Sequence, residues 1–416
     1  MNLFLKIISL TVSRVQTLIS PNTLQIAVSV RQIPVERPNE LARTMAPHPL
    51  IHQELPYDPT YFVYNRRLAT ASLNNLSADE VYWRVRQSVI LRHTGELPLE
   101  IRGPDAEILL NRVFTREIAK NRVGRCSYQF ACYDHGGMIT DGVLVRLAED
   151  RFWFGQADGD LFSWLLANAR GLDVEVFDPD VWVSQVQGPK SLEVLANAID
   201  GAMPDPFKYF DMAEVTIADQ PVVLTRSGFT NELGWEFYLL PNTDIDAVGA
   251  RILEAGKPFD MTPTSADAFR TRRIEAGLLN AGSDFDETTT PFDAGLGHMV
   301  DFDKGDFCGR EALQKSDQRC RTWGLRTEDG VARIGRSLQS NGADAGTVCS
   351  SAWSPYQQCG VAIVRLDDAD LGPGSEFDVT CTDGKVHKAQ TCTTPMYDEK
   401  REIPRGLKID VPNNVA

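Results

Sequence analysis

An acidic side chain and a phenol share one face of the strand expected near residues 234–240. Side chains alternate along a strand, so Glu236 and Tyr238 lie on one face and Trp235 and Phe237 on the other. A carboxylate that faces inward must find hydrogen-bond donors, because an unpaired buried charge is very costly. A pterin-like ring, with an amino group beside an N–H, would supply a matching bidentate partner. The pattern alone favours a second interpretation, an ion pair between Glu236 and an arginine on the sheet surface.

Two further stretches combine charge with an apolar background. Asp141 interrupts an apolar strand, so its carboxyl group either bonds the neighbouring backbone or faces a cavity, and burial requires a partner in both cases. Arg273 and Glu275 flank an apolar ridge on an expected helix, and the acid-rich loop 284–291 follows them. A charge run of this kind is most often a solvated face. The residue pattern leaves the role of both stretches open.

Alternating strands and amphipathic helices must position these residues. Ser77-Ala78-Asp79-Glu80 has the form of a capping box, which predicts that a helix begins there. The order strand, Gly-Pro, helix occurs at 98–113 and again at 181–195, which indicates two related α+β halves. A hairpin is expected at 128–147, and strands at 215–225 and 234–240 form a third antiparallel unit.

The pattern changes near residue 321 to short strands with turn residues. Phe377, Val379 and Cys381 alternate with polar neighbours, which is typical of a half-buried antiparallel sheet. We therefore expect a poorly ordered N-terminal extension at residues 1–44, an α+β region at 45–314 and a small β-domain at 315–416.

Composition restricts the partners of the chain. A formal charge of -15 disfavours nucleic acid and anionic membranes, and no apolar run is long enough to span a bilayer. The eight cysteines never form a C-x-x-C pair, and the six histidines lack the close spacing of metal ligands. We expect reduced thiols, no metal site and a cytoplasmic protein. We also expect a small-molecule substrate and a monomer or homodimer.

Five ordered motifs resemble those of the glycine cleavage T-protein (aminomethyltransferase) family. They are Tyr128 with the turn and strand 136–141, and the runs 228–238, 273–277, 286–291 and 306–313. The similarity covers roughly residue 82 to the C-terminus, and the ordered set is far more specific than any single motif. Within this family the chain is most similar to the dimethylsulfoniopropionate demethylase branch, through the runs 82–84, 99–106, 124–128, 150–153 and 186–191.

The resemblance implies an α+β fold of three domains, in which two α+β folate-binding parts are followed by a C-terminal antiparallel β-barrel domain. It implies tetrahydrofolate as cofactor and a methyl group that moves to folate N5 from a small methylated donor. The best candidate donor is dimethylsulfoniopropionate or a related sulfonium or quaternary ammonium compound. By position, Tyr128 and Phe229 would stack on the folate, Glu236 would hold the pterin edge and Asp141 would lie beside N5. Arg273 transfers to the same folate site.

The donor side departs from the family pattern. Leu91-Arg92-His93 stands where the family often has an aspartate or an aromatic residue, and Ala281 replaces a frequent tyrosine. His93 is therefore a candidate substrate contact, although a lone histidine near a strand is more often structural. Tyr238 is a further candidate substrate contact, and Tyr209, with Phe207 or Phe210, is a candidate cradle for a cationic donor.

Other activities on the same fold stay open at this stage. An aminomethyltransferase that acts on a lipoyl carrier protein and an aryl methyl ether O-demethylase would use the same folate. A non-catalytic folate-binding protein is the alternative from another class.

Overall fold

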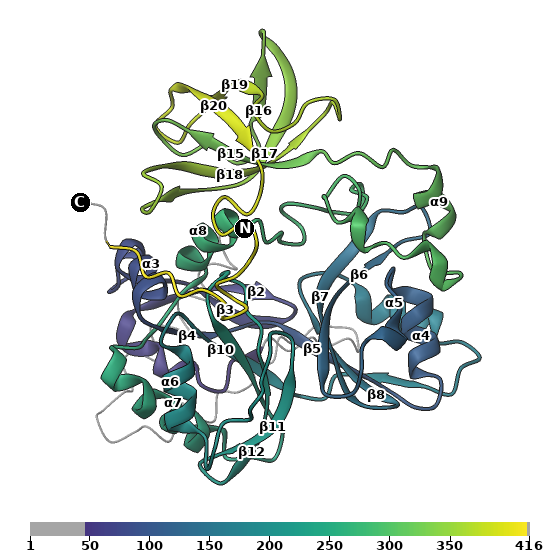
Figure 1. Ribbon diagram of the computed structural model, residues 1–416, viewed down its shortest axis with the longest axis vertical. Coiled ribbons are helices and arrows are strands. Elements are labelled where there is room, and N and C mark those ends of the chain that lie inside the picture. Colours follow the sequence, from purple (N-terminus) through teal and green to yellow (C-terminus); the bar gives the residue numbers. More distant parts are fainter. Residues whose placement is uncertain (1–45, 414–416) are drawn as a thin grey trace, which may run out of the picture.

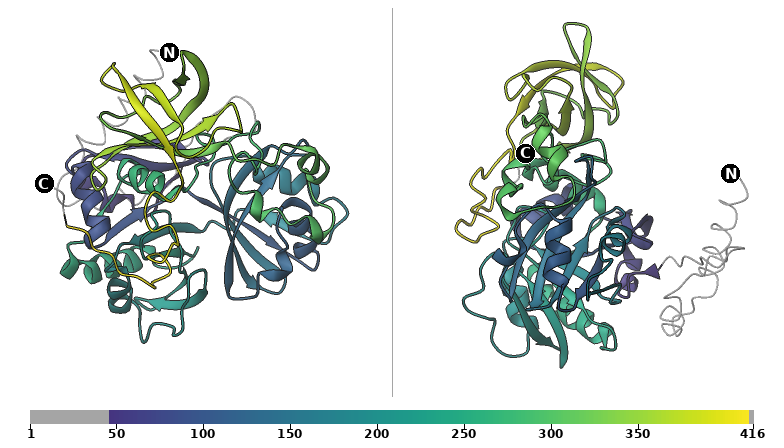
Figure 2. Two further views of the ribbon diagram at one scale, coloured as in Figure 1. Left: turned by 45° about the horizontal axis from the view of Figure 1, so that its top comes forward. Right: turned by 90° about the vertical axis from the view of Figure 1, so that its right-hand side faces the viewer.

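The computed structural model describes residues 46–413, so the extension expected at residues 1–44 lies outside the described residues. The chain forms a six-stranded sheet, a five-stranded sheet and a closed barrel, together with a small three-stranded sheet near its start (Figure 1). Both views in Figure 2 show the barrel on one side of the two larger sheets. The predicted combination of α+β parts with a C-terminal antiparallel barrel is confirmed.

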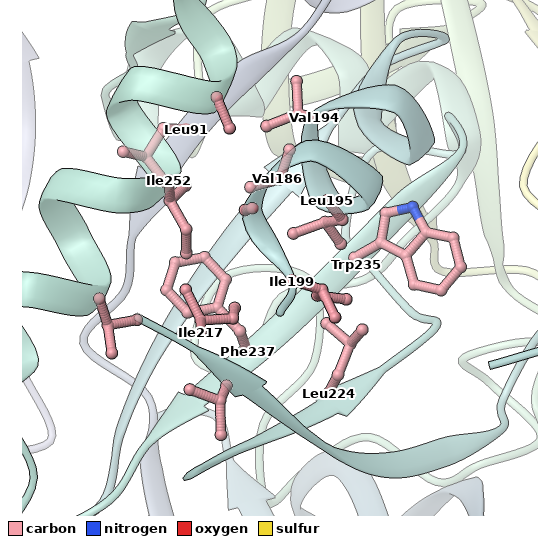
Figure 3. Close-up of a cluster of buried hydrophobic side chains, with 14 of the residues drawn as sticks. Leu91, Val186, Val194, Leu195, Ile199, Ile217, Leu224, Trp235, Phe237 and Ile252 are labelled. Carbon is pink, nitrogen blue, oxygen red and sulfur yellow. The ribbon is translucent and has the colours of Figure 1, made fainter. Parts of the chain in front are cut away.

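The six-stranded sheet has the strand order β11-β12-β13-β10-β4-β14, in which only the pair of β14 and β4 is parallel. Helices α6 and α7 cover one face, and the apolar side chains between them and the sheet, such as Leu195, Phe237 and Ile252, form the main core (Figure 3). The bounds of these elements are β4 (Ile90–His93), β10 (Trp182–Gln187), α6 (Ser191–Ala198), β11 (Met212–Ile217), β12 (Gln220–Thr225), β13 (Gly234–Leu239), α7 (Ile245–Gly256) and β14 (Thr262–Pro263).

The segment 215–225, expected as one strand, is instead a hairpin of β11 and β12. Ala218 and Asp219 form the turn, with φ of 52° and 59°. Two consecutive residues at positive φ match the twist of a two-residue hairpin. Neither residue is the glycine that usually marks such a turn, and this is why the sequence pattern missed it.

The five-stranded sheet has the order β6-β7-β8-β5-β9, with α4 and α5 packed on it. Its other face meets the six-stranded sheet, where Trp153 of β8 stacks on Tyr238 of β13 with ring centroids 5.6 Å apart. The bounds are β5 (Leu97–Arg102), α4 (Ala106–Val113), β6 (Arg125–Cys132), β7 (Met138–Ala148), β8 (Arg151–Gln156), α5 (Leu161–Asn168) and β9 (Glu175–Phe177).

Two glycines show that the strand, glycine, helix unit is used twice in the same way. Gly103 follows β5 with φ of 129°, and Gly188 follows β10 with φ of 131°. A Cβ atom at these positions would lie 2.6 Å from the carbonyl oxygen of Asp173 and 2.4 Å from that of Ser88. Only glycine allows the neighbouring backbone to pass this closely. The prediction of two related halves therefore agrees with the backbone.

The barrel joins β15, β18, β17, β16, β19 and β20 in that order. Helix α8 (Ala266–Ala276) packs between the barrel and helix α3 (Ala78–Gln87). Helix α3 begins with the predicted capping box, in which Ser77 and Glu80 each bond the other's backbone. The bounds of the barrel strands are β15 (Thr322–Thr327), β16 (Ser337–Ser340), β17 (Ala343–Ser354), β18 (Cys359–Leu366), β19 (Glu376–Thr380) and β20 (Val386–Cys392).

The remaining elements connect or cover the two larger sheets and the barrel. They are β1 (Ala46–Pro47), η1 (Ile51–Gln53), η2 (Leu55–Tyr57), β2 (Pro59–Tyr64), β3 (Arg67–Leu73), α3 (Ala78–Gln87), η3 (Ile118–Lys120), η4 (Lys257–Phe259), α8 (Ala266–Ala276), η5 (Gly297–Met299), η6 (Phe302–Lys304) and α9 (Arg310–Lys315). All eight cysteines are free thiols. Within residues 46–413 no helix has the length and apolar character needed to cross a membrane.

Candidate functional site

A row of four side chains crosses the six-stranded sheet. The register pairs Thr225 with Glu236, Glu236 with Gln185, and Gln185 with Arg92. Directly paired residues point to the same face of a sheet, so the four side chains lie side by side. Trp235 packs on the opposite face beneath the helices, as the period-two pattern predicts.

Glu236 is 5% exposed, and its carboxylate is bonded by neutral side chains alone. Gln185 Nε2 donates to Oε1 at 2.9 Å, and Ser227 Oγ donates to Oε2 at 2.6 Å. No arginine or lysine nitrogen of residues 46–413 lies within the 4.0 Å of an ion pair, so the pairing that the pattern alone favoured is not formed. Burial raises the pKa of Glu236, and the hydroxyls of Ser227 and Thr225 oppose that shift.

An unpaired acceptor lies beside this carboxylate. The Oε1 atom of Gln185 is buried and has no hydrogen-bond partner in the described part of the chain. Buried polar atoms nearly always have a partner, so this one indicates donors that a ligand brings. The amino group and ring N–H of a pterin are such donors. The residues present therefore fit the folate that the sequence motifs imply.

Asp141 and Tyr128, both expected at the site, meet in one hydrogen bond. Tyr128 Oη donates to Asp141 Oδ2 at 2.6 Å, across the pair of β6 and β7. Asp141 is 6% exposed, and burial raises its pKa to about 6 although the Tyr128 hydroxyl lowers it. A carboxyl group with this pKa exchanges a proton near neutral pH.

A third carboxyl group, that of Glu96, interacts electrostatically with the other two. Glu96 lies in the short link between β4 and β5, which joins the two larger sheets. Burial and the charge of Glu236 raise the pKa of Glu96 to about 8, and Asp141 acts in the same direction. Three acids from three separate segments therefore act on one another electrostatically.

Arg273 holds the acid-rich loop and the barrel together. Its Nη1 donates to Asp284 Oδ2 at 2.5 Å, and its Nη2 donates to Ser350 Oγ of β17 at 2.7 Å. The positive charge of Arg273 lowers the pKa of Asp141, while the nearby Asp284 raises it. In the stretch for which a solvated face was the usual expectation, Arg273, Glu275 and Asp284 are thus buried, whereas Asp286 is half-buried and Glu287 is exposed.

Tyr209 and Arg401 interact electrostatically with residues of the site. Burial raises the pKa of Tyr209. The positive charge of Arg401 lowers this pKa and the negative charge of Glu236 raises it, so both charges act on the Tyr209 hydroxyl. The Arg401 charge also acts on Tyr128. Arg401 belongs to the segment that returns from the barrel to the sheets (Figure 1), and it is fixed by Asn231 Oδ1 at 3.2 Å.

Three candidate residues pack against other side chains of the protein. His93 lies on the helix-covered face, where it stacks on His48 at 4.6 Å and bonds Ser184 Oγ at 2.8 Å, so it points away from Glu236. Tyr238 is 1% exposed within the contact between the two sheets. Phe229 packs against Val81, Val85, Ile90 and Phe269.

The aromatic residues expected to cradle a cationic donor, Phe207, Phe210 and Tyr209, also differ in their surroundings. Phe207 packs edge-on against Trp235 in the main core, with ring centroids 5.1 Å apart. Phe210 packs partly into the contact between the sheets and lies edge-on to Tyr209 at 4.5 Å. Of these three aromatic residues, Tyr209 is the one near the Glu236 charge.

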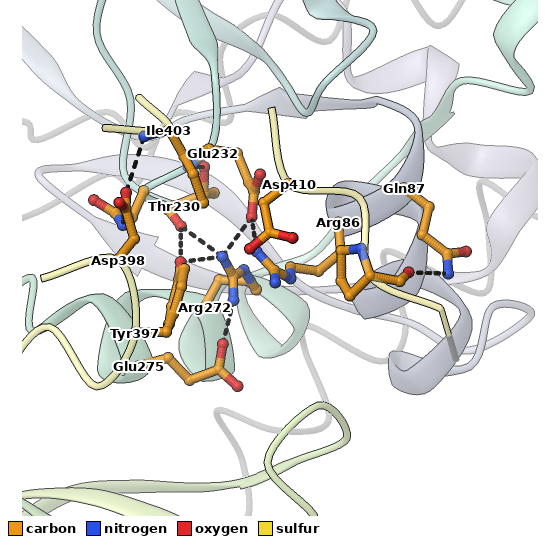
Figure 4. A network of polar contacts seen from close by, with 12 residues as sticks. Arg86, Gln87, Thr230, Glu232, Arg272, Glu275, Tyr397, Asp398, Ile403 and Asp410 are labelled. Atoms are coloured by element: carbon orange, nitrogen blue, oxygen red, sulfur yellow. Dashed lines mark hydrogen bonds and ion pairs between the residues drawn. The ribbon is translucent and has the colours of Figure 1, made fainter. Parts of the chain in front are cut away.

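A buried ion network joins α3, α8 and the loop before β13 (Figure 4). Arg272, which is fully buried, bonds Glu232 at 2.5 Å and also pairs with Glu275 of its own helix. Glu232 in turn accepts from Arg86 of α3 at 2.6 Å, and Tyr397 bonds Arg272 from the segment after the barrel. The network fixes the loop that carries Ser227 relative to α3 and α8.

The sequence pattern missed Glu96, Gln185, Ser227 and Arg401. Gln185 and Ser227 lie inside stretches that were identified, and pairing the expected strands in register would have placed Gln185 beside Glu236. Nothing in the local sequence marks Glu96 or Arg401. In the region 46–413 no three histidine, cysteine, aspartate or glutamate side chains are grouped to hold a metal ion.

Two family models match the chain. The model described as GCVT N-terminal domain matches residues 39–304, and the model described as Glycine cleavage T-protein C-terminal barrel domain matches residues 321–398. Together the two models cover both α+β parts and the barrel.

Relatives with named activities match as well. A trimethylamine-oxide aldolase from Ruegeria pomeroyi is 32% identical over 413 residues, which covers 94% of this chain but only 52% of the relative, so this chain spans about half the length of that protein. An aminomethyltransferase from Symbiobacterium thermophilum is 32% identical over 320 residues, covering 73% of this chain and 84% of the relative. The crystal structure of the glycine cleavage system aminomethyltransferase T from Bartonella henselae matches with a TM-score of 0.77 at 24% identity, covering 85% and 99% of the two chains, and shows the same fold.

Proposed function

Because the chain belongs to the glycine cleavage T-protein family of folate-dependent one-carbon transferases, we propose that it moves a methyl group from a small methylated donor to N5 of tetrahydrofolate. The proposed donor is a sulfonium or quaternary ammonium compound such as dimethylsulfoniopropionate. The relative named for trimethylamine oxide supports a small methylated donor, since that compound is one.

The observation that carries this proposal is the acceptor pair of Glu236 and Gln185. Within residues 46–413, the buried Glu236 carboxylate pairs with no cation and the Gln185 Oε1 atom has no donor, which leaves two acceptors on neighbouring strands. The pterin edge offers two donors, its amino group and a ring N–H. Glu236 and Gln185 would hold this edge, Tyr128 and Phe229 would wall the ring, and Arg273 would keep the loop beside it in place.

Asp141 is the proposed catalytic residue. When bound, tetrahydrofolate supplies N5 as the nucleophile for an already activated methyl carbon. In such a transfer the donor would leave as a neutral sulfide or amine, which keeps the electron pair of the broken carbon bond, and N5 would give up its proton as the new bond forms. Asp141, with a pKa of about 6, would stabilise the positive charge and accept this proton above that pH.

Arg401 and Tyr209 are the other proposed contacts. Arg401 is a cation beside Tyr128 and Tyr209, and it suits the carboxylates of the folate tail. Tyr209 offers an aromatic face to a cationic donor, a contact worth about 0.5 to 2 kcal/mol. His93, on the far face of the sheet, and Tyr238, in the sheet contact, have no direct substrate contact in this scheme.

The test is incubation of the protein with tetrahydrofolate and one donor at a time, followed by mass-spectrometric detection of 5-methyltetrahydrofolate. The donors are dimethylsulfoniopropionate, glycine betaine and a methoxy-aromatic acid. Product from the methoxy compound alone would establish the aryl ether activity instead, and product only with an aminomethylated lipoyl carrier would establish an aminomethyltransferase.

Folate binding is measured separately by tryptophan fluorescence. Glu236→Gln weakens tetrahydrofolate binding by about 10- to 100-fold, because it replaces a charge-assisted acceptor with an amide. Glu376→Gln, on the exposed edge of the barrel, is the matched control and leaves binding unchanged. Equal affinities of wild type and Glu236→Gln would refute the folate site.

A further inference from the structure

Gln187 is a side chain of β10 that the scheme above does not use. It is fully buried and lies two residues after Gln185, so both side chains point to the face of the six-stranded sheet that carries Glu236. Its amide bonds the loop between β12 and β13 at two points. The Nε2 atom donates to the carbonyl oxygen of Ser227 at 3.2 Å, and the Oε1 atom accepts from Thr230 Oγ1 at 2.8 Å. One loop therefore satisfies both polar atoms of this side chain.

Two glycines leave the space that this amide occupies. A Cβ atom at Gly228 or at Gly234 would overlap the Gln187 amide, whose three heavy atoms would be its nearest neighbours. Neither glycine has a φ in the left-handed region, so the backbone conformation does not demand glycine at either position. The amide could make room only by breaking its two hydrogen bonds, and a buried polar group without a partner is costly. The close approach of Gln187 therefore explains both glycines.

Ser227 connects this amide to the proposed pterin acceptor. Its carbonyl oxygen accepts from Gln187, while its Oγ donates to Glu236 Oε2 at 2.6 Å. The same Oγ lies 2.7 Å from Thr225 Oγ1, which belongs to the end of β12. The backbone position of Ser227 decides where its hydroxyl lies. A hydrogen bond that fixes this backbone therefore also fixes the donor to Glu236.

We propose that Gln187 is a positioning residue of the folate site, whose amide holds the loop so that Ser227 donates to Glu236. This assignment rests on the proposed folate binding. In residues 46–413 Gln187 has no hydrogen bond to Glu236, so its effect on the pterin acceptor passes through Ser227. An apolar side chain of similar length would leave the Ser227 carbonyl without this donor and the hydroxyl less well directed at the carboxylate.

The first test measures tetrahydrofolate binding by Gln187→Met with tryptophan fluorescence. Methionine fills a similar space but has no N–H donor and only a weak acceptor. The Kd for tetrahydrofolate should rise by about 10-fold, as expected when a hydrogen bond to the acceptor is weakened. Gln390→Met, at an exposed glutamine of β20, is the matched control and should change the Kd by less than about twofold. Circular dichroism establishes that each variant is folded.

The second test asks whether Gln187 acts through Ser227. Ser227→Ala removes the hydroxyl that donates to Glu236 and should itself raise the Kd by about 10-fold. If the amide serves only to place this hydroxyl, the double variant binds tetrahydrofolate within about twofold of Ser227→Ala alone. Two independent effects would multiply instead, to about 100-fold.

The pH dependence of binding gives a readout that a general loosening of the fold would not move. The Ser227 hydroxyl lowers the pKa of Glu236, so a loss of this contact raises that pKa. On acidification, the tetrahydrofolate affinity of Gln187→Met should therefore begin to fall at a higher pH than that of wild type. The other titrating groups of the site are the same in both proteins, so the difference between the two profiles reports Glu236.

The third test displaces the amide and leaves Gln187 in place. The Cβ atom of Gly228→Ala would overlap the amide, so this variant should also lose about 10-fold in tetrahydrofolate affinity. In a Gln187→Ala background the overlapping group is absent, and the effect of Gly228→Ala should shrink severalfold. Gly372→Ala is the matched control, because no atom lies within 4 Å of the added Cβ atom and the backbone φ is not left-handed.

The outcomes separate this assignment from the proposed function. If wild type does not bind tetrahydrofolate, the folate site is wrong and the assignment falls with it. If wild type binds and Gln187→Met keeps the same affinity, the assignment is overturned and the proposed function stands. Losses of Gln187→Met and Ser227→Ala that multiply overturn it equally, because the amide then acts by another route. If Gln187→Met does not fold, an unchanged affinity of Gly228→Ala overturns the assignment.

Discussion

Asp141→Asn should stabilise the fold while it slows the reaction. The folded-state pKa of Asp141 is about 6 against an ordinary value of 3.8, so the ionised carboxylate is less favourable in the folded chain than in the unfolded one. The difference corresponds to about 3 kcal/mol at pH well above 6. Asparagine cannot ionise, and its amide oxygen still accepts from Tyr128. We expect a gain of about 1 to 3 kcal/mol at pH 7.5.

The sign of the pH dependence follows from the raised pKa. Between pH 3.8 and 6 the folded chain binds more protons at Asp141 than the unfolded chain, so the contribution of this group to stability falls as pH rises. The stabilising effect of Asp141→Asn therefore grows from pH 4 to pH 7 and then levels off. Urea unfolding at a series of pH values measures it.

Activity should move in the opposite direction. Loss of the proton acceptor lowers kcat by about 100-fold or more, and the wild-type rate falls below about pH 6, where Asp141 is protonated. Asp378→Asn, which removes an exposed partner of Lys388 on the barrel, is the matched control and should change stability by less than about 0.5 kcal/mol. An Asp141→Asn protein with unchanged kcat, or with lower stability at pH 7.5, would refute the reasoning.

Two further substitutions test the surroundings of the site. Tyr128→Phe removes the hydrogen bond that lowers the pKa of Asp141, so the acid limb of the pH–rate profile should move to higher pH; a limb that stays in place or moves lower contradicts this pairing. Arg272→Met leaves Glu232 and Glu275 buried without their shared cation and should cost about 3 to 5 kcal/mol in chemical denaturation. Its control, Arg270→Met on the exposed side of the same helix, should cost less than about 1 kcal/mol, and equal losses for the two variants would contradict the role of the network.

Much of the fold follows from local patterns. The capping box at Ser77 begins a helix as predicted, and period-two alternation assigns Glu236 and Trp235 to opposite faces of β13 correctly. The hairpin turn at Ala218 and Asp219 was missed because its conformation comes from the pairing of β11 with β12 and not from residues that demand it.

The site was predictable only in part. Tyr128 and Asp141 were found through ordered motifs, and the structure adds the hydrogen bond between them. His93 was a reasonable candidate from its position in the chain, but strand register turns it toward His48 and the helices. Register depends on which strands pair, and a single sequence does not state this.

The sequence by itself determined the identity of the chemical groups, the face of each strand on which they lie and the family whose motifs they match. The tertiary structure decided the charge state and the partners of those groups. Among residues 46–413 no cation pairs with Glu236, Asp141 has a pKa of about 6, and the charges of both residues raise the pKa of Glu96, because segments far apart in the chain come together in the fold. Burial and electrostatic coupling are properties of that convergence, and no local pattern contains them.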